Sequence, residues 1–170
     1  MSEQAKVLVV DDDEVVRLSY QRSLEAANCN VETVLSGEDA LHALEHENFD
    51  VVLLDLRMAG MDGMSVLKAI KRDWPNSEVV VITGYPSVES VKEAVRLGAY
   101  DYLAKPVGPA EVINAANGAI AQKKWALRKD PSNPDAGAGA ENCWMTLHPR
   151  WLASPSPDAS PDMMIEPTRE

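Results

Sequence analysis

The segment VVLLDLRMAGMDG, residues 51–63, decides the fold class of this chain. Its first four residues form an unbroken run of valine and leucine, which is typical of a strand buried on both faces of a parallel sheet. Asp55 follows this run directly, and Met61, Asp62 and Gly63 supply a turn into the next segment, where apolar residues recur at helical spacing. The segment therefore predicts a buried strand, a loop that carries an aspartate, and a helix.

The same pattern of strand and helix extends outward in both directions. Short apolar runs predict four more strands, at residues 7–10, 31–35, 79–82 and 102–104. Apolar residues recur at helical spacing within residues 15–27, 40–44, 66–70, 88–97 and 112–120. Ser36 and Gly37 are suited to begin the second helix, Gly98 to end the fourth, and Pro109 to occupy the first turn of the fifth. The resulting order is (βα)5, an α/β fold with a doubly wound parallel sheet covered by helices on both faces.

The composition changes near residue 128. Residues 1–128 are predicted to form one domain, whereas residues 129–170 hold seven of the 11 prolines and show no apolar periodicity. This composition predicts a disordered tail without a recognisable output domain. The apolar cluster of the tail, residues 143–152, is compatible with a peptide that docks on a partner and with a solvated tail, and the sequence leaves both open.

Charge and composition exclude several classes of function. The formal net charge of -11 disfavours direct contact with nucleic acid or an anionic membrane surface. The longest apolar runs are four residues, far below the roughly 20 that a membrane helix needs. The start of the chain lacks the pattern of a secretory signal, so we expect a cytoplasmic protein. Cys29 and Cys143 are too few for a disulfide framework and are expected to be reduced thiols.

Polar groups follow four of the predicted strands. In an open parallel sheet these carboxyl ends line one edge, where ligands bind. The groups are Asp11, Asp12 and Asp13 after the first strand, Asp55 after the third, Thr83 after the fourth and Lys105 after the fifth. Crowded carboxylates require a cation, and oxygen ligands favour Mg²⁺. A lysine and a hydroxyl opposite them suit a tetrahedral anion, so the set predicts a phosphoryl pocket with Asp55 as its acceptor.

These residues lie in four motifs: VLVVDDDEVVR (7–17), VVLLDLRMAGMDG (51–63), VVVITGYPSVES (79–90) and LGAYDYLAKP (97–106). Together they make residues 5–125 resemble the receiver domain of two-component response regulators, of the chemotaxis-regulator kind. The resemblance implies the flavodoxin-like strand order 2-1-3-4-5. It also implies a phosphoacceptor switch, rather than an enzyme, that is phosphorylated on Asp55 by a sensor histidine kinase or a histidine phosphotransfer protein.

The resemblance assigns a role to each site residue. Asp12 and Asp55 would ligate Mg²⁺ directly, Asp11 would hold it through water, and the backbone carbonyl of Arg57 would complete the protein ligands. Asp13 resembles the neighbouring acid that is usually not a ligand.

Three further residues resemble the phosphoryl-binding and switch groups of the family. Lys105 would pair with the phosphoryl group, Thr83 would close on it, and Tyr102 would be the aromatic switch. The signalling surface would comprise residues 88–125 and would bind a downstream protein that the sequence does not identify. Whether phosphorylation drives homodimerisation is left open.

The chain departs from the family pattern at Ala59, where a proline is common. Arg57 and Tyr85 occupy positions that tune access of the hydrolytic water in this family, and we expect them to shield the acyl phosphate.

Two other functions compete with this interpretation. An aspartate-nucleophile phosphatase would place a second aspartate two residues after its nucleophile, where this chain has Arg57. A phosphorylation-independent pseudo-receiver, which only binds partners, would normally have lost Asp55, Lys105 or the acidic pair. His42 and His46 have the spacing of a metal pair on a helix, but the sequence shows no group that completes a site, so solvent-facing histidines are expected.

Overall fold

The computed structural model describes residues 4–129 and forms a five-stranded parallel sheet in the order β2-β1-β3-β4-β5. Strands and helices alternate along the chain. The strands are β1 (Lys6–Val10), β2 (Asn30–Val34), β3 (Val51–Leu54), β4 (Glu78–Thr83) and β5 (Asp101–Ala104). The helices are α1 (Glu14–Ala26), α2 (Gly37–His46), α3 (Gly63–Asp73), α4 (Val88–Arg96) and α5 (Pro109–Lys129). The predicted (βα)5 fold and strand order are confirmed.

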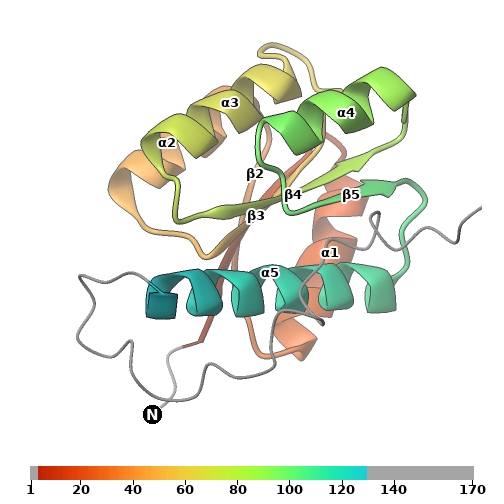
Figure 1. Cartoon of the computed structure of the whole chain (residues 1–170). Coiled ribbons are helices and arrows are strands. Elements are labelled where there is room, and N and C mark those ends of the chain that lie inside the picture. Colours follow the sequence, from red (N-terminus) through yellow and green to blue (C-terminus); the bar gives the residue numbers. More distant parts are fainter. Residues whose placement is uncertain (1–3, 130–170) are drawn as a thin grey trace, which may run out of the picture.

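Helices cover both faces of the sheet, as expected for a doubly wound fold. Figure 1 shows α2, α3 and α4 on one face and α1 and α5 on the other. Alternate residues of each central strand point to opposite faces, so Leu8 and Val10 belong to the core beneath the first group, while Val7 and Val9 belong to the core beneath the second. The two cores together fix the central strands between two layers of helices.

The apolar pattern of each strand matches its position in the sheet, central or at the edge. β1, β3 and β4 are buried on both faces, which is why their sequences are continuous apolar runs. β2 lies at the edge and is only partly buried. It ends at Val34 rather than at residue 35 as predicted, and Leu35 is 54% exposed. The pairing of β2 with β1 therefore ends at Val34, which pairs with Val10.

The sequence signals for the helix ends are confirmed. The side chain of Ser36 accepts a hydrogen bond from the backbone N–H of Asp39 and caps α2. Pro109 is the first residue of α5. Gly98 follows α4 with a φ of +92°, a backbone conformation that favours glycine.

The register of the sheet aligns the carboxyl ends of the strands. Val10 of β1 pairs with Leu54 of β3, and the backbone N–H of Asp55 donates to the carbonyl of Val10 at 3.0 Å. Lys105, directly after β5, donates its backbone N–H to the carbonyl of Thr83 at 2.8 Å. One edge of the sheet therefore carries the polar residues that follow β1, β3, β4 and β5.

The predicted tail lies almost wholly outside the described residues, which end at Lys129, the last residue of α5. Among residues 4–129, none of the helices combines the length and the apolar character required to cross a membrane.

Candidate functional site

The centre of the candidate site is one lysine held between two carboxylates. The Nζ of Lys105 donates to Oδ2 of Asp11 at 2.6 Å and to Oδ2 of Asp55 at 2.9 Å. The side chains of Asp11 and Asp55 are only 3% and 6% exposed, whereas that of Lys105 is 20% exposed. The predicted meeting of the ends of β1, β3 and β5 is thus confirmed by direct contacts.

Asp12 joins this pair from the solvent side. Carboxylate oxygens of Asp11, Asp12 and Asp55 all lie within 4.8 Å of one another, and of the three only Asp12 is exposed. Oδ2 of Asp12 accepts a hydrogen bond from the backbone N–H of Ala59 at 3.4 Å. A proline at residue 59 could not donate this bond, so the departure from the family pattern adds a donor to the acidic cluster.

Asp13 caps a helix, unlike Asp11 and Asp12, which face the acidic cluster. Its Oδ1 accepts hydrogen bonds from the backbone N–H groups of Val15 at 2.9 Å and Val16 at 3.3 Å, so it is the N-cap of α1. The Asp13 backbone N–H donates to Oδ1 of Asp11 at 2.9 Å and thereby orients the buried carboxylate. This structural role explains why an aspartate stands at residue 13, and no role as a metal ligand is needed to explain it.

Burial and charge act in opposite directions on the central groups. Burial raises the pKa of the Asp11 carboxyl above its ordinary value, although the hydrogen bond and charge of Lys105 work against this. For Lys105, burial lowers the pKa of the ammonium, but the hydrogen bonds and charges of Asp11 and Asp55 outweigh burial and leave the pKa raised. The lysine is therefore charged near neutral pH and balances two carboxylates only in part.

This donor set fits Mg²⁺. The cluster consists of carboxylate oxygens with one exposed member, and hard oxygen ligands with access to water are what Mg²⁺ prefers. Three carboxylates beside one ammonium also leave uncompensated negative charge, which a divalent cation would neutralise. The backbone at Arg57 is held close by, because its N–H donates to Oδ1 of Asp55 at 3.0 Å.

Thr83 and Tyr85 form the next part of the same edge. Thr83 is fully buried at the end of β4, and its Oγ1 accepts a hydrogen bond from the backbone N–H of Tyr85 at 3.3 Å. Tyr85 is 70% exposed, and the guanidinium carbon of Arg57 lies 5.2 Å from the centroid of its ring. The two residues expected to shield the site are thus in a cation–π contact with each other.

Tyr102 lies farther along, on β5, and is half-buried. Its hydroxyl shares a hydrogen bond of 2.7 Å with Oγ of Ser90. Ser90 forms a capping box with Ser87 at the start of α4, since each side chain bonds the backbone N–H of the other residue. Tyr102 is therefore tied to the first turn of α4.

Sequence reasoning assigned no role to Ser90 or to Arg17, although both stand in the quoted motifs. Arg17 is 9% exposed, and its Nη1 donates to the backbone carbonyl of Asp11 at 2.7 Å. Spacing on α1 could have placed Arg17 on the buried face, but a bond to a backbone carbonyl leaves no signature in side-chain patterns.

A family model described as the response regulator receiver domain matches residues 7–117. The chain belongs to this family. The match covers every residue of the site described above, from Asp11 to Lys105.

Curated relatives of this receiver domain are longer proteins. The chain is 36% identical over 127 residues to the DNA-binding transcriptional regulator NtrC of Klebsiella pneumoniae, covering 74% of this chain and 27% of that protein. It is 45% identical over 101 residues to the transcriptional regulatory protein ZraR of Escherichia coli K12, covering 59% of this chain and 23% of that protein. The chain thus spans about a quarter of the length of these relatives.

Solved structures support the same fold. A CheY-like response regulator receiver domain protein from Methanospirillum hungatei JF-1 matches with a TM-score of 0.70 at 26% identity, covering 72% of this chain and 98% of that one. The described part of this receiver domain therefore corresponds to a whole chain in that structure.

Proposed function

We propose that this receiver domain accepts a phosphoryl group on Asp55 from the phosphohistidine of a sensor histidine kinase or a histidine phosphotransfer protein, in a reaction that depends on Mg²⁺. The observation that carries the proposal is the position of Asp55. Its carboxylate is buried, contacts the Lys105 ammonium at 2.9 Å, and lies in a cluster of three carboxylates at the ligand-binding edge of the sheet.

In this reaction a carboxylate oxygen of Asp55 attacks phosphorus as the bond from phosphorus to the imidazole nitrogen breaks, and the imidazole leaves. Asp11, Asp12, Asp55 and the backbone carbonyl of Arg57 would hold Mg²⁺. The bound cation would offset charge on the phosphoryl oxygens. Lys105 moves from its two carboxylate partners toward the new phosphoryl group, whose negative charge favours the charged form of the ammonium.

The new charge at Asp55 then changes the surface of the domain. Thr83 moves toward the phosphoryl group, and Tyr102 turns inward into the space that Thr83 vacates, which shifts an existing equilibrium between two states. This inward turn breaks the hydrogen bond from Tyr102 to Ser90 and so alters the start of α4. The face formed by α4, β5 and α5 is the proposed binding site for a downstream protein, in the cytoplasm, with neither nucleic acid nor membrane as a direct ligand. Two lysines of α5 already have partners within the domain, since Lys123 forms an ion pair with Asp50 and Lys129 lies over the Trp125 ring.

Arg57 and Tyr85 are proposed to lengthen the life of the acyl phosphate. Their cation–π contact places a bulky pair beside the end of β3 and β4, where it would hinder an attacking water. Replacing both by alanine should speed dephosphorylation, measured as decay of the phosphorylated mass after removal of the donor. A slower decay in the double variant would contradict the shielding role.

The experiment that tests the function is the intact mass after incubation with phosphoramidate, with and without Mg²⁺. We expect one added phosphoryl group that requires Mg²⁺ and is absent from Asp55→Asn. Asp73→Asn is the matched control, because Asp73 is an exposed aspartate at the end of α3 that pairs with Arg72, away from the site. An adduct that persists in Asp55→Asn would overturn the assignment of the acceptor. No adduct under any condition would favour the phosphorylation-independent binding module.

A second comparison separates the metal ligand from its neighbour. Asp12→Asn should greatly slow the reaction, because it removes a charged oxygen ligand from the acidic cluster. Asp13→Asn should leave the rate nearly unchanged, because asparagine caps a helix about as well as aspartate. Equal rates for the two variants, measured by the same mass assay over time, would refute the assignment of Asp12 to the metal.

A further inference from the structure

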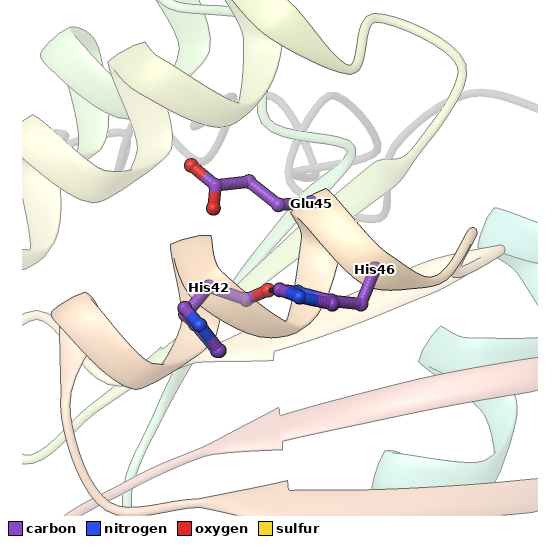
Figure 2. Close-up of side chains that lie close together, drawn as sticks. All are labelled: His42, Glu45 and His46. Carbon is purple, nitrogen blue, oxygen red and sulfur yellow. Dashed lines mark hydrogen bonds between the residues drawn. The ribbon is translucent and has the colours of Figure 1, made fainter.

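A second cluster of metal-ligating groups lies on α2, away from the acidic site. His42, Glu45 and His46 each offer one ligand atom, and these atoms all lie within 4.8 Å of one another. Figure 2 shows the carboxylate of Glu45 and the ring of His46 both reaching back along the helix toward His42. The spacing of three and four residues places all three on one helix face. The cluster thus supplies the third group that the sequence analysis did not find beside the histidine pair.

One hydrogen bond prepares His46 for metal binding. Its Nδ1 lies 2.8 Å from the backbone carbonyl of His42. A carbonyl oxygen only accepts, so Nδ1 donates this bond and Nε2 is the ring nitrogen that a metal ion would bind. Histidines that bind metals are commonly oriented in this way, by a second bond from the other ring nitrogen to a carbonyl or carboxylate. The ring of His46 is therefore held in the tautomer that a metal ion requires, with the ring centroid of His42 4.4 Å away.

The Glu45 carboxylate is available as the third ligand. Within residues 4–129 it forms neither a hydrogen bond nor an ion pair. Two neighbouring acids differ in this respect, because Asp39 accepts a hydrogen bond from the hydroxyl of Ser36 and Glu47 forms an ion pair with Lys6. A carboxylate oxygen of Glu45 lies within 4.8 Å of a ring nitrogen of each histidine.

The surroundings favour a cation. The two histidines line a hollow of about 390 Å³, to which Glu32, Asp39 and Glu47 also contribute. Glu47 is paired with Lys6, but the carboxylates of Glu32 and Asp39 lower the electrostatic potential at the imidazoles and raise the local concentration of cations. All three proposed ligands are exposed, so an ion reaches them without opening the fold.

We propose that His42, Glu45 and His46 form a surface site for a divalent transition-metal ion of the Zn²⁺ class, separate from the acidic site of Asp55. Two imidazoles and one carboxylate suit Zn²⁺, whereas Mg²⁺ prefers an all-oxygen set. Tetrahedral Zn²⁺ needs ligand atoms about 3.4 Å apart, so these exposed side chains would rotate to bring their ligand atoms, now within 4.8 Å of one another, closer together. Three protein ligands leave the fourth position to water or to a group from another molecule.

The test is isothermal titration of the full chain, stripped with a chelator, with Zn²⁺ in the presence of excess Mg²⁺ to occupy the acidic site. We expect a binding event of one Zn²⁺ per chain that is weakened at least about tenfold in His42→Ala and in His46→Ala, and weakened also in Glu45→Gln. Glu93→Gln is the matched control, because it neutralises an exposed glutamate on α4 and should bind Zn²⁺ as the parent does. Since the replaced residues are exposed, circular dichroism should show every variant folded.

Two results would overturn the proposal. One is the absence of Zn²⁺ binding by the parent chain under these conditions. The other is unchanged binding by the double variant His42→Ala/His46→Ala, which would assign the ion to the acidic cluster or to a thiol. The variant Asp12→Asn tests whether Zn²⁺ binds at the acidic cluster. If Zn²⁺ binds at His42, Glu45 and His46, this variant should bind it with the same affinity as the parent chain.

Discussion

Replacing Lys105 by methionine tests the electrostatic balance at the centre of the site. The variant keeps an unbranched apolar chain but removes the ammonium that contacts Asp11 at 2.6 Å and Asp55 at 2.9 Å. Two carboxylates, 3% and 6% exposed, then face each other without a buried counter-charge. The folded state should lose stability when divalent cations are absent, because neither carboxylate can be hydrated as it is in the unfolded chain.

The expected magnitude comes from the burial of the three groups. Removing one partner of a fully buried ion pair costs about 3–5 kcal/mol. The Lys105 side chain is 20% exposed, so solvent already screens part of its charge and we expect a loss of about 2–3 kcal/mol. For a domain of this size, 1 kcal/mol corresponds to roughly 4 °C in Tm, so the Tm should fall by about 8–12 °C.

The assay is thermal unfolding followed by circular dichroism, in a chelator and in excess Mg²⁺. A divalent cation takes over the role of the ammonium, so Mg²⁺ should raise the Tm of Lys105→Met more than that of the parent. Lys71→Met is the matched control, because Lys71 is similarly buried and pairs with Glu78 at 3.0 Å, far from the acidic cluster. It should lose stability without a larger response to Mg²⁺.

The reasoning would be refuted if Lys105→Met were as stable as the parent in the chelator. It would also fail if Mg²⁺ stabilised Lys105→Met and the parent equally, because the cation would then not substitute for the missing ammonium.

Two further predictions concern packing and a buried thiol. Gly63→Ala should lower the free energy of unfolding, measured in urea, by about 1–3 kcal/mol. A Cβ at residue 63 would lie 2.5 Å from Cα of Leu56 and 2.6 Å from the carbonyl oxygen of Asp55, both backbone atoms that cannot move aside. An unchanged unfolding midpoint would contradict this. Cys29 is 8% exposed, and burial raises the pKa of its thiol. In a Cys143→Ser background, iodoacetamide should therefore alkylate Cys29 at least about tenfold more slowly in the folded protein than in urea. Equal rates would show that the thiol is accessible.

The fold was predictable because local and tertiary preferences agree along the chain. The runs that became β1, β3 and β4 are continuously apolar at residues 7–10, 51–54 and 79–82, and a parallel sheet with helices on both faces buries such strands completely. The edge strand β2 was placed one residue too late. Its alternation of exposed and partly buried residues gives a weaker pattern, so nothing in the sequence distinguished the exposed Leu35 from the end of the strand.

The meeting of Asp11, Asp55 and Lys105 was predictable from topology alone, because each follows a strand of one parallel sheet. Contacts that depend on the direction of a side chain were not predictable in this way. The bond from Tyr102 to Ser90 joins a strand to a helix start through two hydroxyls, and the guanidinium of Arg57 reaches the Tyr85 ring across two loops. Residue types restrict such contacts only weakly, since either side chain could have pointed to solvent.

The same contacts suit the switch that we propose. Asp11 and Asp55 are buried beside each other with one shared ammonium, an arrangement that costs stability and that a purely structural core would replace by apolar groups. In the function that we propose, that cost would favour the binding of a cation and then, with the cation bound, the transfer of a phosphoryl group to Asp55. Tyr102 is partly buried, packs against the core beneath α2, α3 and α4, and shares a hydrogen bond with Ser90 through its hydroxyl. In the function that we propose, charge added at the carboxylates would change the start of α4, because the two regions are joined by the short β4 and β5 strands that pair Thr83 with Ala104.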